Sequence, residues 1–151
     1  MPARDSVRLS LRLMSTSRLI EREVDAMMRA RFSSTIARFD FLSALDRHGA
    51  LTLGEISQHL LVSNGNVTQL NTRTAADGLM QSETDARDRR VRRVRLTAKG
   101  EAAFKQMARA HAALIDRLLA ELTQADRTAP MRLTDAAKAS IRRTLTKGAS
   151  P

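Results

Sequence analysis

The segment between residues 51 and 97 changes from helical to strand periodicity, and this change limits the folds open to the chain. Thr52 is followed three residues later by Glu55, a capping-box pattern that predicts the start of a short helix. Ser63 can cap a second helix, which should end at Gly78. Beyond Gly78, alternating residues predict two short strands, in LMQSET and VRRVRL, on either side of the polar tip DARDRR. Two short helices followed by a hairpin predict a winged helix-turn-helix.

Long amphipathic helices are expected on both sides of this segment. Apolar residues recur at helical spacing from residue 6 to about residue 31, and a second helix is expected in IARFDFLSALDRH. After the hairpin, an apolar stripe continues at helical spacing to Leu122. Pro130 should break or kink the tail, with the last helix restarting near Thr134. The predicted fold class is mainly α with a small β-hairpin wing: a winged helix-turn-helix domain flanked by long helices.

One compact unit with three parts is expected from this order of elements. The N-terminal helices of residues 1–50 and the C-terminal helices of residues 98–151 are predicted to dimerise, and residues 51–97 to form the winged helix-turn-helix domain. This domain is too small to bury the long helices, whose apolar faces need each other and a second copy of the chain. A homodimer is therefore expected, although a purely intramolecular bundle could also absorb these faces.

The charge of the chain points to an anionic partner. The sequence carries 26 lysine and arginine residues against 16 acidic ones, a formal net charge of +10, and all but four of the cations are arginine. Nucleic acid is the first candidate partner and an anionic membrane surface the second. A GC-rich genome also enriches arginine, so the positions of the arginines carry more information than their number.

Membrane, secretory and cysteine chemistry are disfavoured. No apolar run approaches the roughly 18 residues that a spanning helix needs, and the basic N-terminus lacks the apolar core of a signal peptide. A cytoplasmic location without membrane contact is expected. The sequence contains no cysteine, which excludes disulfides, thiolate metal sites and thiol redox sensing.

Catalytic signals are weak. His48, His59 and His111 lie in separate segments without metal-site spacing, and an interior position is expected for His111. The carboxylates of the central segment stand in basic or capping contexts that favour ion pairing, and there is no phosphate-binding glycine loop or serine elbow. We therefore expect no metal, no cofactor and no enzymatic activity.

The second short helix has the composition of a base-reading helix. Val67 and Leu70 should pack inward and leave polar residues on the other side. Asparagine and glutamine can bond adenine, arginine can bond guanine, and the residues at the start of the helix are best placed in a major groove. An ordinary solvent-exposed polar face is the alternative. The candidate DNA-binding residues of this segment are Ser63, Asn64, Gly65, Asn66, Thr68, Gln69 and Arg73.

A resemblance to the MarR family of winged-helix regulators covers roughly residues 36–110. It is carried by LTLGEISQHLLVSNGNVTQL, ADGLM and DARDRRVRRVRLTAKG. The family's wing looks like Asp-Pro-x-Asp-Arg-Arg followed by Leu-Thr-x-x-Gly, which this chain matches at Asp85, Asp88, Arg89, Arg90, Leu96, Thr97 and Gly100. The resemblance implies a dimer on a pseudo-palindromic operator in double-stranded DNA, with a recognition helix in each major groove and a wing in the neighbouring minor groove.

The resemblance also implies roles for the charged residues of the wing. Arg90 becomes the minor-groove arginine, and Asp88 the carboxylate that braces the wing as a fixed ion-pair neighbour of Arg90. Arg87 and Arg89 would mainly contact phosphates. The arginines of the second strand, Arg93 and Arg95, are expected on its outer face, whereas Arg92 has no expected role.

Three residues depart from the family pattern. Ala86 stands where proline is common, so the wing tip is expected to be less rigid. Asn71 and Thr74 stand where relatives usually carry apolar residues. Either these two side chains loosen the packing of the recognition helix, or they join its DNA-facing side.

The N-terminal half resembles the MarR subgroup that responds to hydroxycinnamoyl-coenzyme A thioesters, through LRLMSTSRLIEREV, STIARFDFLSALDR and AAFKQMARAHAALIDRLL. Arg12, Arg18 and Arg38 are the candidate ligand-binding residues, because they could meet a carboxylate or coenzyme A phosphates; solvated arginines are the alternative. The resemblance implies a small aromatic effector, either an acyl-CoA thioester or an aromatic carboxylate, that releases the protein from DNA.

The leading hypothesis is a homodimeric, sequence-specific transcriptional repressor. A structural protein that coats DNA without sequence preference is the alternative from another class. An enzyme with a basic anion site is a third hypothesis, which the missing catalytic constellation disfavours.

Overall fold

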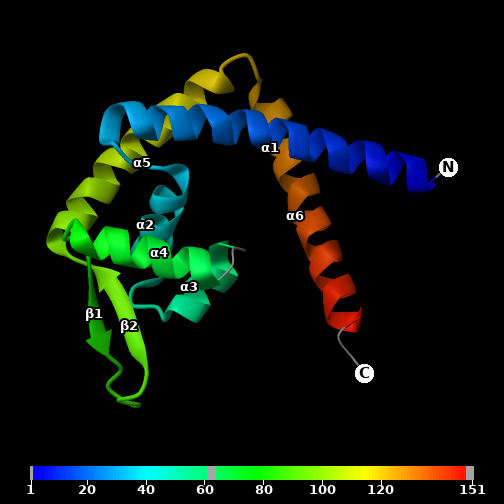
Figure 1. The fold of residues 1–151 in the computed structure, drawn as a ribbon. Helices are drawn as coiled ribbons and strands as arrows, with labels where there is room; N and C mark the ends of the chain where they lie inside the picture. The colour runs from blue at the N-terminus through cyan, green and yellow to red at the C-terminus, as the bar shows by residue number, and fades with distance from the viewer. Residues whose placement is uncertain (1, 61–63, 149–151) are drawn as a thin grey trace. The chain divides into compact units, whose positions relative to one another are not determined.

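The computed structural model describes residues 2–60 and 64–148, and of residues 2, 3, 64, 147 and 148 only the backbone (Figure 1). The described chain forms two compact units, one up to Leu114 and the other from Ile115 onward, where a single unit was expected. Its elements are α1 (Pro2–Phe32), α2 (Ile36–His48), α3 (Leu53–Leu60), α4 (Asn64–Ala76), β1 (Met80–Thr84), β2 (Arg92–Leu96), α5 (Ala98–Leu118) and α6 (Gln124–Gly148).

The core of the first unit forms around α2. Thr35 caps this helix by accepting a hydrogen bond from the backbone N–H of Arg38 at 3.2 Å. At the other end, Gly49 has a φ of 75° and donates its N–H to the carbonyl oxygen of Leu45 at 2.9 Å. Phe41 and Leu42 are completely buried between these two ends. The helix predicted in IARFDFLSALDRH is therefore confirmed.

The capping box before α3 is also confirmed. The backbone N–H of Glu55 donates to the Thr52 hydroxyl at 3.1 Å, and the backbone N–H of Thr52 donates to the Glu55 carboxylate at 2.8 Å. These two bonds satisfy donors that a helix start leaves unpaired. The second predicted cap, Ser63, lies outside the described residues. The helix after it, α4, stops before Gly78, which has a φ of 71°.

The wing is a two-stranded antiparallel hairpin that projects from the helices (Figure 1). Its register pairs Met80 with Leu96 and Ser82 with Val94. The backbones of Leu51 and Val94 exchange hydrogen bonds of 3.0 and 2.8 Å, so the residues before α3 extend the sheet by one bridge. Val94 and Leu96 are buried, which confirms the predicted alternation.

The predicted start of α5 is confirmed, but its predicted end is wrong. As predicted, Thr97 caps the helix by accepting a hydrogen bond from the N–H of Gly100 at 3.1 Å. The apolar stripe was expected to continue on one helix to Leu122, but α5 ends at Leu118. The reason is a second capping box, in which Thr123 and Asp126 exchange backbone-to-side-chain bonds of 3.0 and 3.2 Å and start α6.

The predicted break at Pro130 is wrong, because α6 continues through this residue without interruption. A proline inside a helix removes one backbone donor and crowds the preceding turn. Here the helix is exposed on both sides of Pro130, so water can satisfy the freed carbonyl group. The hydroxyl of Thr134, the expected restart, instead donates back to the carbonyl oxygen of Pro130 at 2.8 Å within the same helix.

Most of the exposed large apolar side chains lie on two helices, α1 and α6. In α1 these are Val7, Leu9, Leu11, Leu13, Met14 and Leu19, and in α6 they are Met131, Leu133, Ile141 and Leu145. Among the described residues, no helix combines the length and the apolar composition needed to span a membrane. These exposed faces are the surfaces for which the sequence predicts a second copy of the chain.

Candidate nucleic-acid interface

One face of α4 packs inward. Val67 and Thr74 are completely buried, and Asn71 lies between them on the same side. The side-chain oxygen of Asn71 is buried without a hydrogen-bond partner in the described part of the chain. Asn71 and Thr74 therefore do not join an exposed DNA-facing side, and they occupy packing positions with polar groups.

A second face of α4 borders a cleft. Asn66, Gln69 and Arg73 follow one another at helical spacing and line a cleft of about 620 Å³ together with residues of α1 and α2. The opposite wall contains the carboxylates of Glu21, Asp25 and Asp40. Three predicted base-reading residues therefore share one acidic cleft.

The third face of α4 is fully open to solvent. Gly65, Thr68 and Thr72 are exposed on the side away from the cleft, and no atom lies within 4 Å of the position that a Gly65 side chain would occupy. Thr72 donates its hydroxyl to the carbonyl oxygen of Thr68 at 3.1 Å, which leaves its methyl group available for contact. Thr72 was not predicted, although its four-residue spacing from Thr68 was visible. Ser63 lies outside the described residues, and of Asn64 only the backbone is described.

Asp85 organises the wing tip. Its carboxylate accepts hydrogen bonds from the backbone N–H groups of Arg87 at 2.8 Å and Asp88 at 3.2 Å, and from Nε of Arg93 at 2.6 Å. The Arg93 bond, followed by the two backbone bonds, lowers the pKa of Asp85 from 3.8 to about 2. Asp85 therefore stays ionised at pH values where an unperturbed aspartate is largely protonated.

Asp88 braces the wing in a different way from the one predicted. Its carboxylate accepts a hydrogen bond from the backbone N–H of Arg90 at 2.9 Å, and its carbonyl oxygen accepts one from the N–H of Val91 at 3.0 Å. Within the described residues it forms no ion pair with an arginine side chain. Asp88 thus orients Arg90 through the backbone.

The arginines of the wing fall into two groups. Arg93 and Arg95 are paired with carboxylates, Arg93 with Glu55 at 2.9 Å as well as with Asp85, and Arg95 with Glu83 at 2.8 Å. Arg93 therefore ties the wing to α3, where only an outer-face position was expected.

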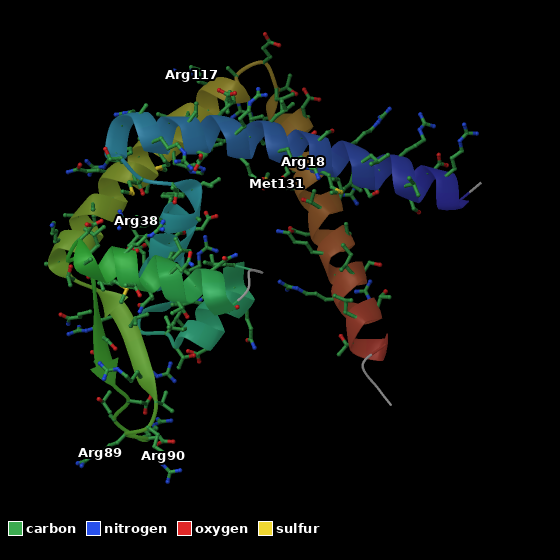
Figure 2. The ribbon with its side chains drawn as sticks, viewed as in Figure 1. Arg18, Arg38, Arg89, Arg90, Arg117 and Met131 are labelled. Carbon is green, nitrogen blue, oxygen red and sulfur yellow. The ribbon has the colours of Figure 1, made fainter. Side chains whose placement is uncertain are left out.

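The second group remains available to a ligand. Arg87, Arg89 and Arg90 are exposed and form no ion pair in the part of the chain that the structure describes. Figure 2 shows Arg89 and Arg90 at the end of the hairpin, pointing away from the helices. The wing thus presents an uncompensated positive tip on a folded support.

The three predicted ligand-binding arginines lie in different environments. Arg12 and Arg18 are exposed on α1. Arg38 is only 16% exposed, and its guanidinium donates to the carbonyl oxygen of Arg73 at 2.9 Å and pairs with Asp77. Two clefts of the described chain are lined by Arg38, and in neither of them does Arg38 meet Arg12 or Arg18.

The histidines form ring contacts. His48 and His59 stack with ring centroids 4.2 Å apart, and His111 packs on Phe39 with centroids 4.9 Å apart. Across residues 2–60 and 64–148, no group of three or more histidine and carboxylate side chains is arranged to hold a metal ion.

The sequence matches a known family. The model of the MarR family matches residues 35–91, from the cap of α2 to the end of the wing tip. The HTH-type transcriptional repressor MdtR of Bacillus subtilis (strain 168) is 30% identical over 90 residues, which are 60% of this chain and 58% of that protein. The chain thus matches a little over half the length of this curated relative.

Solved structures have the same fold. BldR from Sulfolobus solfataricus superposes with a TM-score of 0.80 and 15% identity, over 91% of this chain and 99% of that one. A mutant of MarR from E. coli complexed with operator DNA superposes with a TM-score of 0.78 and 20% identity, over 88% of this chain and 95% of that one. The predicted fold class, mainly α with a β-hairpin wing, is confirmed.

Proposed function

We propose that the chain is a sequence-specific DNA-binding transcriptional regulator that acts as a homodimeric repressor, because the MarR family model matches residues 35–91 and a transcriptional repressor is 30% identical over 90 residues. The observation that carries this proposal is the wing tip, where Asp85 and Asp88 hold the backbone of a turn whose arginines are unpaired. Arginine fits a narrow minor groove, where the electrostatic potential is most negative. A regulator of transcription acts at the chromosome, so a cytoplasmic location is part of the proposal.

The recognition helix in this proposal is α4. Its outward face offers Gly65 for close approach of the backbone and the methyl groups of Thr68 and Thr72 for contact with thymine methyl groups. Asn66, Gln69 and Arg73 border this face from the cleft side and can reach base edges only at its margin. Ser63 and Asn64 remain predicted contacts at the start of the helix.

The homodimer is supported by the exposed apolar residues of α1 and α6. Leu11 is 61% exposed in α1 and Leu145 is 68% exposed in α6. These exposed residues support an interaction surface, because large exposed apolar patches mark interaction sites in many proteins. In the proposed dimer, residues 1–50 and 98–151 supply the interface, and two copies of residues 51–97 read a pseudo-palindromic operator.

Selection of bound duplexes from a random pool tests this function. We expect two half-sites about one helical turn apart, because a two-fold symmetric dimer places two recognition helices in successive major grooves. The selected duplex should bind on the order of 10³-fold or more tightly than a random duplex at the same salt concentration. Gel filtration with light scattering gives the mass of the protein and of the complex.

The same experiment separates the main alternative. A structural protein that coats DNA would bind selected and random duplexes equally, with a steep loss of affinity as salt rises. That outcome would contradict the proposed repressor and favour a structural protein that coats DNA. A single unpaired half-site in the selected pool would contradict the proposed dimer.

We further propose that a small aromatic acid or its coenzyme A thioester releases the protein from DNA. The cleft of about 620 Å³ suits an anion less well, because its three carboxylates outnumber its two arginines, and one of these, Arg29, is already paired with Asp25 at 2.6 Å. A second cleft, of about 560 Å³, is lined by Arg38, Lys99, Phe32 and Met107 and by one carboxylate, that of Asp77, which pairs with Arg38. These cations and apolar groups match the chemistry of an aromatic carboxylate, whereas the exposed Arg12 and Arg18 can meet phosphates only at the surface.

Thermal unfolding with candidate effectors tests this second proposal. An effector that favours the DNA-free state should raise the unfolding temperature of the free protein and weaken operator binding at the same concentration. A hydroxycinnamoyl-CoA thioester, the corresponding free acid and coenzyme A alone are compared. A response to the free acid without a response to the thioester excludes the thioester, and no response to either contradicts an aromatic effector of this class.

A further inference from the structure

The C-terminal end of α4 is held by side chains from two other helices. Arg38, from α2, donates Nη2 to the carbonyl oxygen of Arg73 at 2.9 Å and forms an ion pair with Asp77. Lys99, from α5, donates Nζ to the carbonyl oxygen of Asp77 at 2.8 Å. The last carbonyl groups of a helix lack partners within the helix and carry its negative dipole end, so two cations are favourable there.

Two further bonds restrict movement at this end. The Thr97 hydroxyl donates to the carbonyl oxygen of Gly78 at 2.7 Å, immediately after the helix. Nε of Arg38 approaches the hydroxyl of Thr74 at 3.4 Å, and Thr74 is completely buried. The arginine is itself mostly buried, so its side chain is already ordered where it meets the helix.

The packing of α4 gives a reason for such a device. Two of its inward positions, Asn71 and Thr74, carry polar groups, and the Asn71 oxygen has no partner within the described residues. The apolar contacts of α4 therefore constrain its orientation less than they would if all of its inward residues were apolar. Directional hydrogen bonds from Arg38 and Lys99 add the constraint that the packing lacks.

We propose that Arg38, Asp77 and Lys99 form a clamp that sets the angle at which α4 is presented to DNA. Arg38 is then a positioning residue that acts through α4. This inference rests on the proposed function of α4 as the recognition helix, and it gives Arg38 a positioning role in the free protein in addition to its proposed place in the effector cleft.

The geometry of a helix shows why the clamp matters at a distance. The 13 residues of α4 span roughly 20 Å at 1.5 Å per residue. A tilt of about 10° at the clamped end moves the first turn by roughly 3 Å over that length. Hydrogen bonds to base edges tolerate only a few tenths of an ångström, so loss of the clamp disrupts base reading more than phosphate contact.

The test compares Arg38→Met, Arg38→Lys and Lys99→Met with the control Arg22→Met. Arg22 is exposed on α1 and pairs with the adjacent Glu23, so its replacement removes the same charge from a site remote from the clamp. Hydrogen exchange at the amides of Asp77, Gly78 and Leu79 is measured in the free protein. Affinity is measured for the duplex that the wild type selects and for a random duplex.

Arg38→Met should accelerate exchange at these amides by about tenfold or more and lower operator affinity by about tenfold or more, while random-duplex affinity falls no further than in Arg22→Met. Arg38→Lys should be intermediate, because an ammonium group lacks the fork that serves Arg73 and Asp77 together. Lys99→Met removes one exposed hydrogen bond, so it should also accelerate exchange and lower operator affinity, but by less than Arg38→Met. This variant keeps the test valid if Arg38→Met does not fold.

Unchanged exchange at the end of α4 would overturn the clamp. Faster exchange with a wild-type ratio of operator to random affinity would overturn the positioning role and leave a local anchor. If the wild type itself prefers no duplex, the proposed function fails, and the exchange measurement alone then decides whether the clamp holds α4.

Discussion

Replacing Gly100 by alanine is expected to lower the free energy of unfolding by at least about 3 kcal/mol, at the upper end of the range for overpacking. A methyl group at this position would lie 1.8 Å from the carbonyl oxygen of Leu79 and 2.8 Å from its carbonyl carbon. Both are backbone atoms, so no side-chain rotation relieves the clash. The first turn of α5 would have to move away from the start of the wing. Denaturant unfolding at matched protein concentrations measures the loss.

Gly54→Ala is the matched control. Gly54 lies in the first turn of α3, where an added methyl group meets only the Thr52 hydroxyl at 3.9 Å. Alanine forms helices better than glycine, so this variant should be stabilised by up to about 1 kcal/mol. Equal stability of the two variants would show that the close approach of α5 to Leu79 does not constrain the fold.

Replacing Arg90 by alanine is expected to weaken operator binding by about 1 to 3 kcal/mol. Arg90 is exposed at the wing tip without an ion-pair partner in the described residues, and its backbone is held by Asp88. Its insertion into a minor groove would therefore break no existing ion pair in the free protein. Preference for flanks with a narrow groove should also weaken, and the dependence of affinity on salt should become shallower. Titrations of the selected duplex at several salt concentrations measure both effects.

Arg92→Ala is the control for this prediction. It removes the same charge from the same wing, but Arg92 lies on β2 and donates Nε to the Ser82 hydroxyl at 3.1 Å, away from the tip. It should reduce affinity only by the amount expected for a lost surface charge. If the titration curve of Arg90→Ala equals that of the wild type, the assignment of Arg90 to the minor groove is wrong.

The elements near residues 51–97 could be predicted because their signals are local. The bond between Thr52 and Glu55 links residues three apart, and the same holds for Thr97 and Gly100. Such bonds form whenever the helix starts, regardless of the rest of the fold. The predicted break at Pro130 was wrong because it depends on information that is not local. The strength of a proline as a breaker depends on whether its neighbours are buried, which periodicity does not reveal.

The division of α4 into three faces could not be predicted. Polarity separated Val67 from the polar residues, but it could not separate Thr68 from Asn66 and Gln69, which border the cleft. That distinction depends on the residues of α1 and α2 that form the other side of this cleft. Polarity also left Thr74 undecided between the packed side and the DNA-facing side of α4, and the structure buries it completely.

Apart from the boundary between α5 and α6, the sequence alone determined which segments become helices and strands, and it identified the arginine-rich hairpin as a folded wing. Only the tertiary structure decided which charges remain available on it. Arg93 is paired with Glu55, 38 residues away, and Arg38 with Asp77, 39 residues away, whereas Arg90 points outward at the tip (Figure 2). The physical reason is range: caps and turns join near neighbours in the chain, whereas the pairing of a long side chain depends on which distant segments the core brings together.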